Sequence, residues 1–173
     1  MKMKAMFLIA LVAGCVGCST APCPAPPPDT TAQDQAAIKA LEDKFTTAFN
    51  AKDTTAIMSL YVPDDSLIVF DAAIPRQYTG AAAYAKDWND FWTMFPGSAT
   101  FTLSDLDVTV GGNVAYSHSI QHATMTDKKG KKMDMTVRVT DGYKKINGQW
   151  LISHEHVSVP VNFATMKPDV NSK

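Results

Sequence analysis

The last predicted strand of the chain, residues 150–160, constrains the fold more than any other stretch. The Asn147-Gly148 pair just before it is the strongest short-range signal for a β-hairpin, so this strand must pair with the segment that precedes the turn. Because side chains alternate along a strand, one face carries two large apolar groups, two imidazoles and a hydroxyl: Trp150, Ile152, His154, His156 and Ser158. This order predicts a core face that opens into a polar pocket.

Length and charge limit what the chain can be. It has 173 residues, with 16 Lys plus Arg against 17 Asp plus Glu. Once a leader and a tether are set aside, roughly 135 residues remain, which is the size of one ordinary domain. The chain has no basic surplus to neutralise phosphates, so nucleic acid is not an expected partner.

Residues 1–14 have the pattern of a signal peptide. A short cationic start precedes an apolar run at 5–13 that is too short to span a bilayer. The run ends in Leu11-Val12-Ala13-Gly14-Cys15, which resembles the lipobox of bacterial lipoproteins, where the cysteine becomes the lipidated N-terminus. Cys18 as the lipidated residue, or an ordinary secretory cleavage site, are the alternatives. We therefore expect a protein of the bacterial cell envelope, lipid-anchored at Cys15 and facing the periplasm or the cell exterior.

Residues 15–30 are a Cys- and Pro-rich tether. Proline fixes φ and removes a backbone donor, so this stretch predicts an extended spacer between the anchor and the domain. All three cysteines, Cys15, Cys18 and Cys23, lie within it. The domain that follows therefore has no disulfide, thiol nucleophile or cysteine metal site.

The rest of the chain predicts helices followed by strands. Ile38, Leu41 and Phe45 recur at helical spacing within a helix over 31–50. A short helix follows Asp53, and a third, rich in aromatic residues, runs from about Gly80 to residue 95. Strands are predicted at 66–70, 99–109, 113–124, 132–145 and 149–160, with glycine in the turns between the last four. The order predicts an α+β domain over 31–166, with a short tail at 167–173.

Three segments resemble the nuclear-transport-factor-2-like, or SnoaL-like, superfamily, which includes the ketosteroid isomerases and the association domain of calcium/calmodulin-dependent kinase II. These segments are 49–53 (Phe-Asn-Ala-Lys-Asp), 69–80 (Val-Phe-Asp leading to Tyr-Thr-Gly) and the ending 147–160. The resemblance covers residues 31–166. It implies a cone-shaped domain in which three helices pack in a curved antiparallel sheet. Such folds carry isomerases, dehydratases and binding modules, so the resemblance does not fix an activity.

The strand register decides which residues face the cone. If Asn147-Gly148 and Lys129-Gly130 are both two-residue turns, Asp141 lies opposite His154 and also opposite His118. This register collects the apolar residues and the histidines on one face, and leaves Ser117, Arg138 and Glu155 on the other, more polar face. A three-residue turn at either place would bring Thr140 and Arg138 to the core face instead.

The first register predicts a catalytic constellation of His118, Asp141 and His154. A carboxylate between two imidazoles orients them and raises their basicity, as general acid–base chemistry on a carbonyl or enol substrate requires. A buried hydrogen-bond network without chemistry is the alternative. Further ligand-binding candidates are His156, Tyr116, Tyr143, Tyr78, Trp88 and Trp92. His154 and His156 are spaced for one metal ion, but structural zinc sites usually have more ligands, so we expect no metal and no cofactor.

These observations lead to three functional hypotheses. The first is an exported, lipid-anchored domain that binds a small, largely apolar molecule in its cone. The second is an enzyme of the ketosteroid isomerase or dehydratase type that uses the His/Asp set. The third is an assembly module without a ligand, which forms a homodimer through the outer face of the sheet.

Overall fold

The computed structural model describes residues 29–171. The predicted signal peptide, Cys15 and nearly all of the tether lie outside the described residues. Within that range, none of the helices has both the length and the apolar character needed to span a lipid bilayer.

Three helices form where the apolar spacing predicts them: α1 (Thr31–Ala51), α2 (Thr54–Met58) and α3 (Ala81–Met94). Lys52 ends α1 in the left-handed conformation, with φ of 55°. Asp53 then caps α2, since its Oδ1 accepts a hydrogen bond from the N–H of Ala56 at 2.9 Å. These two residues explain why one helical region becomes two helices.

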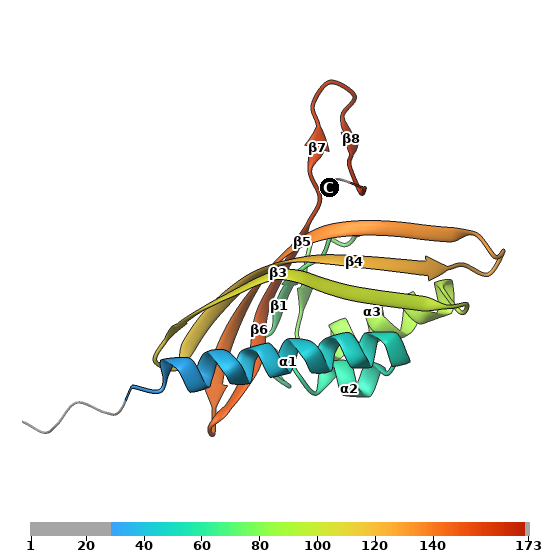
Figure 1. The fold of residues 1–173 in the computed structure, drawn as a ribbon. Helices are drawn as coiled ribbons and strands as arrows, with labels where there is room; N and C mark the ends of the chain where they lie inside the picture. Colours follow the sequence, from blue (N-terminus) through green and yellow to red (C-terminus); the bar gives the residue numbers. More distant parts are fainter. Residues whose placement is uncertain (1–28, 172–173) are drawn as a thin grey trace, which may run out of the picture.

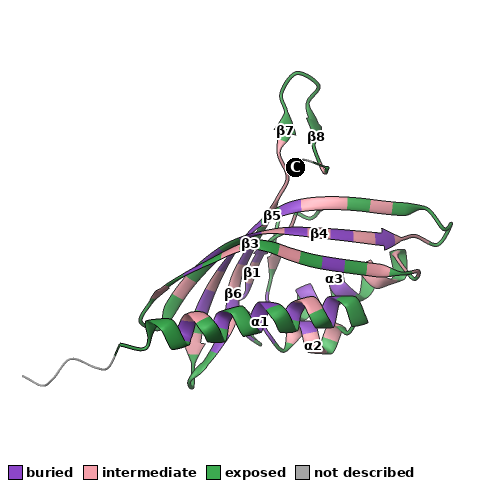
Figure 2. Ribbon diagram, viewed as in Figure 1, coloured by how far each residue is buried: buried purple, intermediate pink, exposed green. Residues whose placement is uncertain are grey.

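A six-stranded sheet curves over the helices (Figure 1). Its strands are β1 (Ile68–Phe70), β2 (Tyr78–Thr79), β3 (Ala99–Gly111), β4 (Val114–Thr126), β5 (Lys132–Ile146) and β6 (Gln149–Ser158), in the order β2-β1-β6-β5-β4-β3. All neighbours are antiparallel except β1 and β6. The predicted α+β class with a curved sheet is confirmed. The sequence did not predict β2 or the hairpin of β7 (Val161–Asn162) and β8 (Lys167–Pro168), which projects from the sheet and is exposed (Figures 1 and 2).

The core lies between the helices and the concave face of the sheet, where buried residues gather (Figure 2). Its centre is aromatic. The ring of Phe49 on α1 lies 4.7 Å from that of Phe101 on β3, and 5.8 Å from that of Trp88 on α3. Burial of such large rings is the main stabilising contribution to this domain.

Asp34 ties the start of α1 to the β5–β6 hairpin. Its Oδ1 accepts hydrogen bonds from Lys145 Nζ (2.7 Å) and Trp150 Nε1 (3.0 Å), and its Oδ2 from the hydroxyl of Thr30 (2.8 Å). The hydrogen bonds from Lys145 first, then from Trp150 and Thr30, lower the pKa of Asp34 to about 2. These hydrogen bonds hold the first turn of α1 against the β5–β6 hairpin.

The β4–β5 register differs from the predicted one by one residue. Lys129-Gly130 is not a two-residue turn, because Asp127 organises a five-residue loop between Thr126 and Lys132. Asp127 Oδ1 accepts hydrogen bonds from the N–H groups of Lys129 (2.7 Å) and Lys131 (2.9 Å). The longer loop puts His118 opposite Thr140 rather than Asp141.

The β5–β6 register starts as predicted and then shifts. Tyr143 lies opposite Ile152, but Gly142 lies opposite His154, so Ser153 is an extra residue in β6. The hydroxyl of Ser153 donates to the carbonyl of Gly142 at 3.1 Å. Beyond this bulge Asp141 is opposite Glu155, not His154.

Two one-residue shifts therefore exchange the faces of β4 and of the second half of β6. Ser117, Ser119, Gln121 and Glu155, which the sequence placed on the polar outer face, are buried under the sheet. His118, His156 and Tyr116, which were expected inside, are exposed. The inward assignment of Val139, Asp141 and Tyr143 is correct.

Candidate functional site

Glu155 on β6 is the centre of a buried polar site. Its Oε2 accepts a hydrogen bond from the hydroxyl of Tyr61 at 2.5 Å, and its Oε1 one from the hydroxyl of Tyr84 at 2.6 Å. Tyr61 follows α2, whereas Tyr84 lies in the first turn of α3. Because the bulge at Ser153 turns Glu155 inward, three separate elements meet at one carboxyl group.

A second carboxyl group enters from α1. Glu42 Oε1 accepts a hydrogen bond from the hydroxyl of Tyr143 at 2.6 Å, and that hydroxyl lies 2.7 Å from Ser117 Oγ. Glu42 is 3% exposed. We name the buried acids and tyrosines together the acid–tyrosine cluster: Glu42, Tyr61, Tyr84, Asp141, Tyr143 and Glu155.

Asp141 on β5 completes this cluster. It lies opposite Glu155 across the strand pair and is 2% exposed. Within residues 29–171, its Oδ1 has no hydrogen-bond partner. A buried carboxyl oxygen normally has a partner, so this atom is open to a donor from a bound molecule or water.

Burial changes the acidity of all three acids. It raises the pKa of Glu155 to about 7, against the lowering effect of the two tyrosine hydrogen bonds. Burial, and then the charges of Glu155 and Glu42, raise the pKa of Asp141 well above its usual range. Burial also raises the pKa of Glu42. The cluster therefore holds protons near neutral pH, and can accept or donate one.

Aromatic rings extend from the cluster along α3. The ring of Tyr84 lies 5.5 Å from that of Tyr61 and 5.8 Å from that of Trp88. Trp88 in turn stacks on Trp92 at 5.6 Å. In the described part of the chain, the buried Nε1 atoms of both tryptophans are without a hydrogen-bond partner. These rings offer an apolar surface with two free N–H donors.

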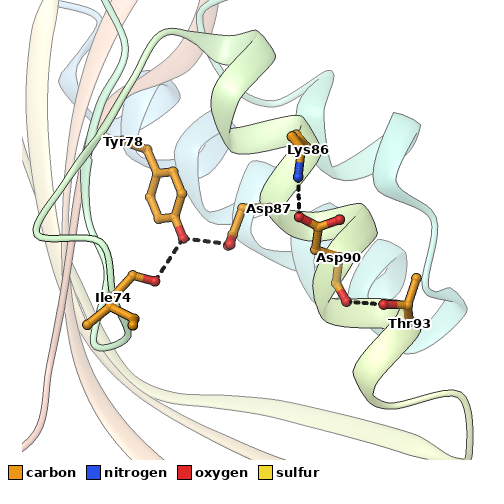
Figure 3. Close-up of polar contacts among 6 residues, drawn as sticks. All are labelled: Ile74, Tyr78, Lys86, Asp87, Asp90 and Thr93. Carbon is orange, nitrogen blue, oxygen red and sulfur yellow. Dashed lines mark hydrogen bonds and ion pairs between the residues drawn. The ribbon is translucent and has the colours of Figure 1, made fainter.

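The loop between β1 and β2 meets α3 through Tyr78 (Figure 3). The hydroxyl of Tyr78 lies 2.6 Å from Asp87 Oδ1 on α3 and 3.3 Å from the carbonyl of Ile74, which is 92% exposed. The ring of Tyr78 is 5.5 Å from that of Tyr84. Asp71 at the start of this loop is half-buried, and burial raises its pKa. Two carboxyl groups thus stand where loop 71–77 meets α3.

The predicted catalytic constellation does not form. Asp141 is inside, whereas His118 lies on the outer face, opposite Thr140 and Asp107. The outer face also carries His154, whose Nδ1 donates to the carbonyl of Ile68 at 2.8 Å. The two register shifts described above are the reason.

The predicted ligand-binding residues also divide between the interior of the domain and the outer face of the sheet. Tyr143, Tyr78, Trp88 and Trp92 belong to the acid–tyrosine cluster or border it. Tyr116 is 51% exposed on the outer face, so its predicted place in the pocket is wrong. His156 is also exposed there, with its ring 5.8 Å from that of Phe70.

Four residues of the site were not predicted from the sequence: Glu42, Tyr61, Tyr84 and Glu155. A signal for Glu42 was available, because it follows Ile38 by four residues and precedes Phe45 by three, within the apolar stripe of α1. Glu155 carried no such signal, since its inward direction depends on the bulge.

No group of three His, Cys, Asp or Glu side chains within residues 29–171 is arranged to hold a metal ion. The acid–tyrosine cluster consists of hydrogen-bonded pairs rather than converging ligands. The chemistry that it can supply is hydrogen bonding and proton transfer.

A sequence profile of the SnoaL-like domain matches residues 38–162. The chain belongs to the SnoaL-like domain family. This assignment confirms the predicted superfamily, and the matched segment contains every member of the acid–tyrosine cluster. A comparison with curated proteins gives no match.

Solved structures confirm the nuclear-transport-factor-2-like fold of this SnoaL-like domain. A protein of unknown function from Pseudomonas putida KT2440 is 27% identical, with a TM-score of 0.74 over 83% of this chain and 98% of that one. A proposed scytalone dehydratase from Novosphingobium aromaticivorans is 19% identical (TM-score 0.67, 75% and 86% covered). A ketosteroid isomerase-like protein from Erwinia carotovora atroseptica is 20% identical (TM-score 0.63, 73% and 95% covered). The last two similarities show the fold alone.

Proposed function

We propose that this SnoaL-like domain binds a small, largely apolar molecule beneath its curved sheet, with a polar group of that molecule held by Asp141 and Glu155. The observation that carries the proposal is the unmatched hydrogen-bonding capacity of the site. Asp141 Oδ1 and the indole N–H groups of Trp88 and Trp92 are buried without partners among the described residues. Leaving such groups unpaired costs stability, which a bound molecule would restore.

The surroundings of these groups support an apolar body for the ligand. Trp88 and Trp92 stack, and Phe91 packs edge-on against Trp92 at 5.0 Å. Small-molecule sites commonly combine apolar walls with a few convergent polar groups. The acid–tyrosine cluster and these rings provide both.

Export and lipid anchoring at Cys15 are part of the same proposal. They rest on the cationic start, the short apolar run and the lipobox-like residues 11–15. A lipid at Cys15 followed by the Pro-rich tether would hold the domain away from the membrane surface. A ligand of the cell envelope would then be within reach.

Native mass spectrometry of the full chain, followed by denaturing extraction, tests the binding proposal. We expect a co-purifying small molecule that is lost in the Asp141→Asn variant. The control is Asp43→Asn on the exposed side of α1, which should retain it. A molecule that persists in Asp141→Asn would contradict the assignment of this site.

A second candidate function is acid–base catalysis by Glu155. The observation that favours it is the pKa of about 7, since a general acid or base works best with a pKa near the working pH. The structural relatives named as a dehydratase and as isomerase-like support a screen of carbonyl and hydroxyl compounds. A turnover that survives in Glu155→Gln would exclude this role.

We also propose that two copies pair through the outer face of the sheet. Tyr116 and Phe70 are exposed large apolar side chains of this face, at 51% and 38%. Sedimentation velocity should show a dimer that Tyr116→Asp dissociates, whereas Lys39→Glu on the exposed side of α1 leaves it intact. A monomeric wild-type chain would refute the pairing.

A further inference from the structure

We propose that the ligand of this site is a small protonated amine with an apolar body. The inference rests on the binding site proposed above and adds the charge of the ligand. It is carried by the charges around Glu155, by the unpartnered oxygen of Asp141 and by the aromatic rings beside them.

The charged groups around the site favour a cationic ligand. The buried acids of α1, β5 and β6 have no cationic partner, because none of the three ion pairs found within residues 29–171 involves Glu42, Asp141 or Glu155. Lys145 instead pairs with Asp34, and Lys52 donates to the carbonyl groups of Phe95 and Gly97. Where these acids are ionised, they repel an anionic ligand and attract a cation.

The unpaired acceptor of the site also favours a ligand that donates hydrogen bonds. Asp141 Oδ1 is an acceptor without a donor, in a side chain that is 2% exposed. An ionised carboxylate only accepts hydrogen bonds, while an ammonium group supplies up to three donors and no acceptor. A protonated amine therefore supplies the donor that the ionised form of Asp141 lacks, and its binding must displace the proton that burial favours on this carboxyl group, whose pKa is raised.

The aromatic rings beside the site favour a cationic ligand as well. The hydroxyl of Tyr84 donates a hydrogen bond to Glu155. The ring centre of Tyr84 lies 5.8 Å from that of Trp88, which in turn lies 5.6 Å from that of Trp92. Aromatic faces attract cations that lie within about 6 Å of the ring centre, and the attraction is strongest for tryptophan. The same rings accommodate the apolar body of the amine.

The side of the site that is nearest the surface also carries carboxyl groups. Asp71 and Asp87 stand where loop 71–77 meets α3, and Asp71 is among the charges that act on Glu155. Carboxyl groups along an approach path raise the local concentration of cations. The carboxyl groups of Asp71 and Asp87 therefore favour a cation at the surface, as the buried acids do in the interior.

A protonated amine must compete with the proton on Glu155. The groups that face Glu155 or act on it come from every element packed around it: Glu42, Tyr61, Asp71, Tyr84 and Asp141. Since the pKa of Glu155 is about 7, amine binding should release a proton below that pH. The affinity should fall about tenfold for each pH unit below the pKa.

Three nearly isosteric probes test the charge: benzylamine, benzyl alcohol and benzoate, titrated into the full chain by calorimetry. We expect benzylamine to bind at least about tenfold more tightly than benzyl alcohol, and benzoate not to bind. Benzylamine affinity should be about 30-fold lower at about pH 5.5 than at about pH 8, with proton release seen as a dependence on the buffer's ionisation enthalpy. Asp141→Asn should weaken benzylamine, whereas Asp90→Asn on the exposed side of α3 should not.

The outcomes separate the two proposals. Equal or tighter binding of benzyl alcohol, or affinity that rises as the pH falls, would overturn the amine inference and leave the binding site standing. Binding of benzylamine that Asp141→Asn does not change would place the amine elsewhere and overturn the inference as well. A lack of binding by every probe would overturn the amine inference, and the co-purification experiment would then decide the binding site on its own.

Discussion

Replacing Glu155 by glutamine tests whether the buried carboxyl group titrates as its surroundings require. Burial, with the charges of Asp71 and Glu42 nearby, raises its pKa from 4.5 to about 7. The folded protein therefore binds this proton more tightly than the unfolded chain does. Between these two pKa values the folded state holds more protons, so the free energy of unfolding falls as the pH rises.

The magnitude follows from the size of the shift. Each pKa unit corresponds to about 1.4 kcal/mol. A shift from 4.5 to about 7 therefore removes about 3 kcal/mol of stability as the pH rises from about 4.5 to about 8. Glutamine keeps the size of the side chain but cannot ionise, so the variant lacks this part of the decline. Asp141 and Glu42, whose pKa values are also raised, add a decline of the same sign to both the wild type and the variant.

Urea unfolding followed by tryptophan fluorescence measures this slope at several pH values. We expect Glu155→Gln to lose less stability than the wild type between about pH 4.5 and pH 8, by about 3 kcal/mol. Asp43→Asn on the exposed side of α1 should keep the wild-type slope. Identical slopes in wild type and Glu155→Gln would refute the assignment of a raised pKa to this residue.

Three further predictions follow from other parts of the chain. Asp34→Ala should lower the melting temperature by several degrees, because Trp150 Nε1 loses its partner, while the exposed Asp43→Ala should not. Since its pKa is lowered, the stability from Asp34 is present above its usual pKa of 3.8 and is lost as the pH falls through about 2, which acid titration of the wild type checks. Phe49→Ala should lower the free energy of unfolding by about 3–5 kcal/mol, measured with denaturant. Phe163→Ala should change it by no more than about 0.5 kcal/mol, because Phe163 is 85% exposed. Equal losses in the two variants would contradict the assignment of Phe49 to the core. Cys15→Ala should remove the lipid mass from the chain in mass spectrometry, and a lipid retained in this variant would contradict Cys15 as the anchor.

The sequence predicted the elements of this fold because their apolar periodicity is strong. The stripe of Ile38, Leu41 and Phe45 gave α1, and the Asn147-Gly148 turn gave the pairing of β5 with β6. The inward direction of Asp141 was also predictable, because it lies two residues from both Val139 and Tyr143 and so shares their face of the strand. Each of these features depends on residues close in sequence.

The composition of the site could not be predicted in the same way. It depends on the hydrogen bonds that Asp127 makes in the β4–β5 loop and on the bulge at Ser153. Each changes the register by one residue, and a one-residue change moves a whole strand face from core to solvent. The predicted His118 and His154 therefore lie outside, and Glu155 takes their place inside.

The side chains of Tyr61 and Tyr84 were missed for a different reason. Both are aromatic residues on helical stretches, where packing is the usual role. Their hydroxyl groups gain a second role only because Glu155 lies between them. Contacts between residues 71 or more positions apart in the sequence carry no local pattern.

The most direct test of the binding site is the set of indole N–H signals in an NMR spectrum of the full chain. The chain has three tryptophans. Trp150 Nε1 is bonded to Asp34, while those of Trp88 and Trp92 have no partner among the described residues. On titration with benzylamine, the account predicts shifts for Trp88 and Trp92 and an unchanged signal for Trp150. A shift of Trp150 alone, or no shift of Trp88 and Trp92 with any of the three probes, would contradict a ligand site beneath the sheet.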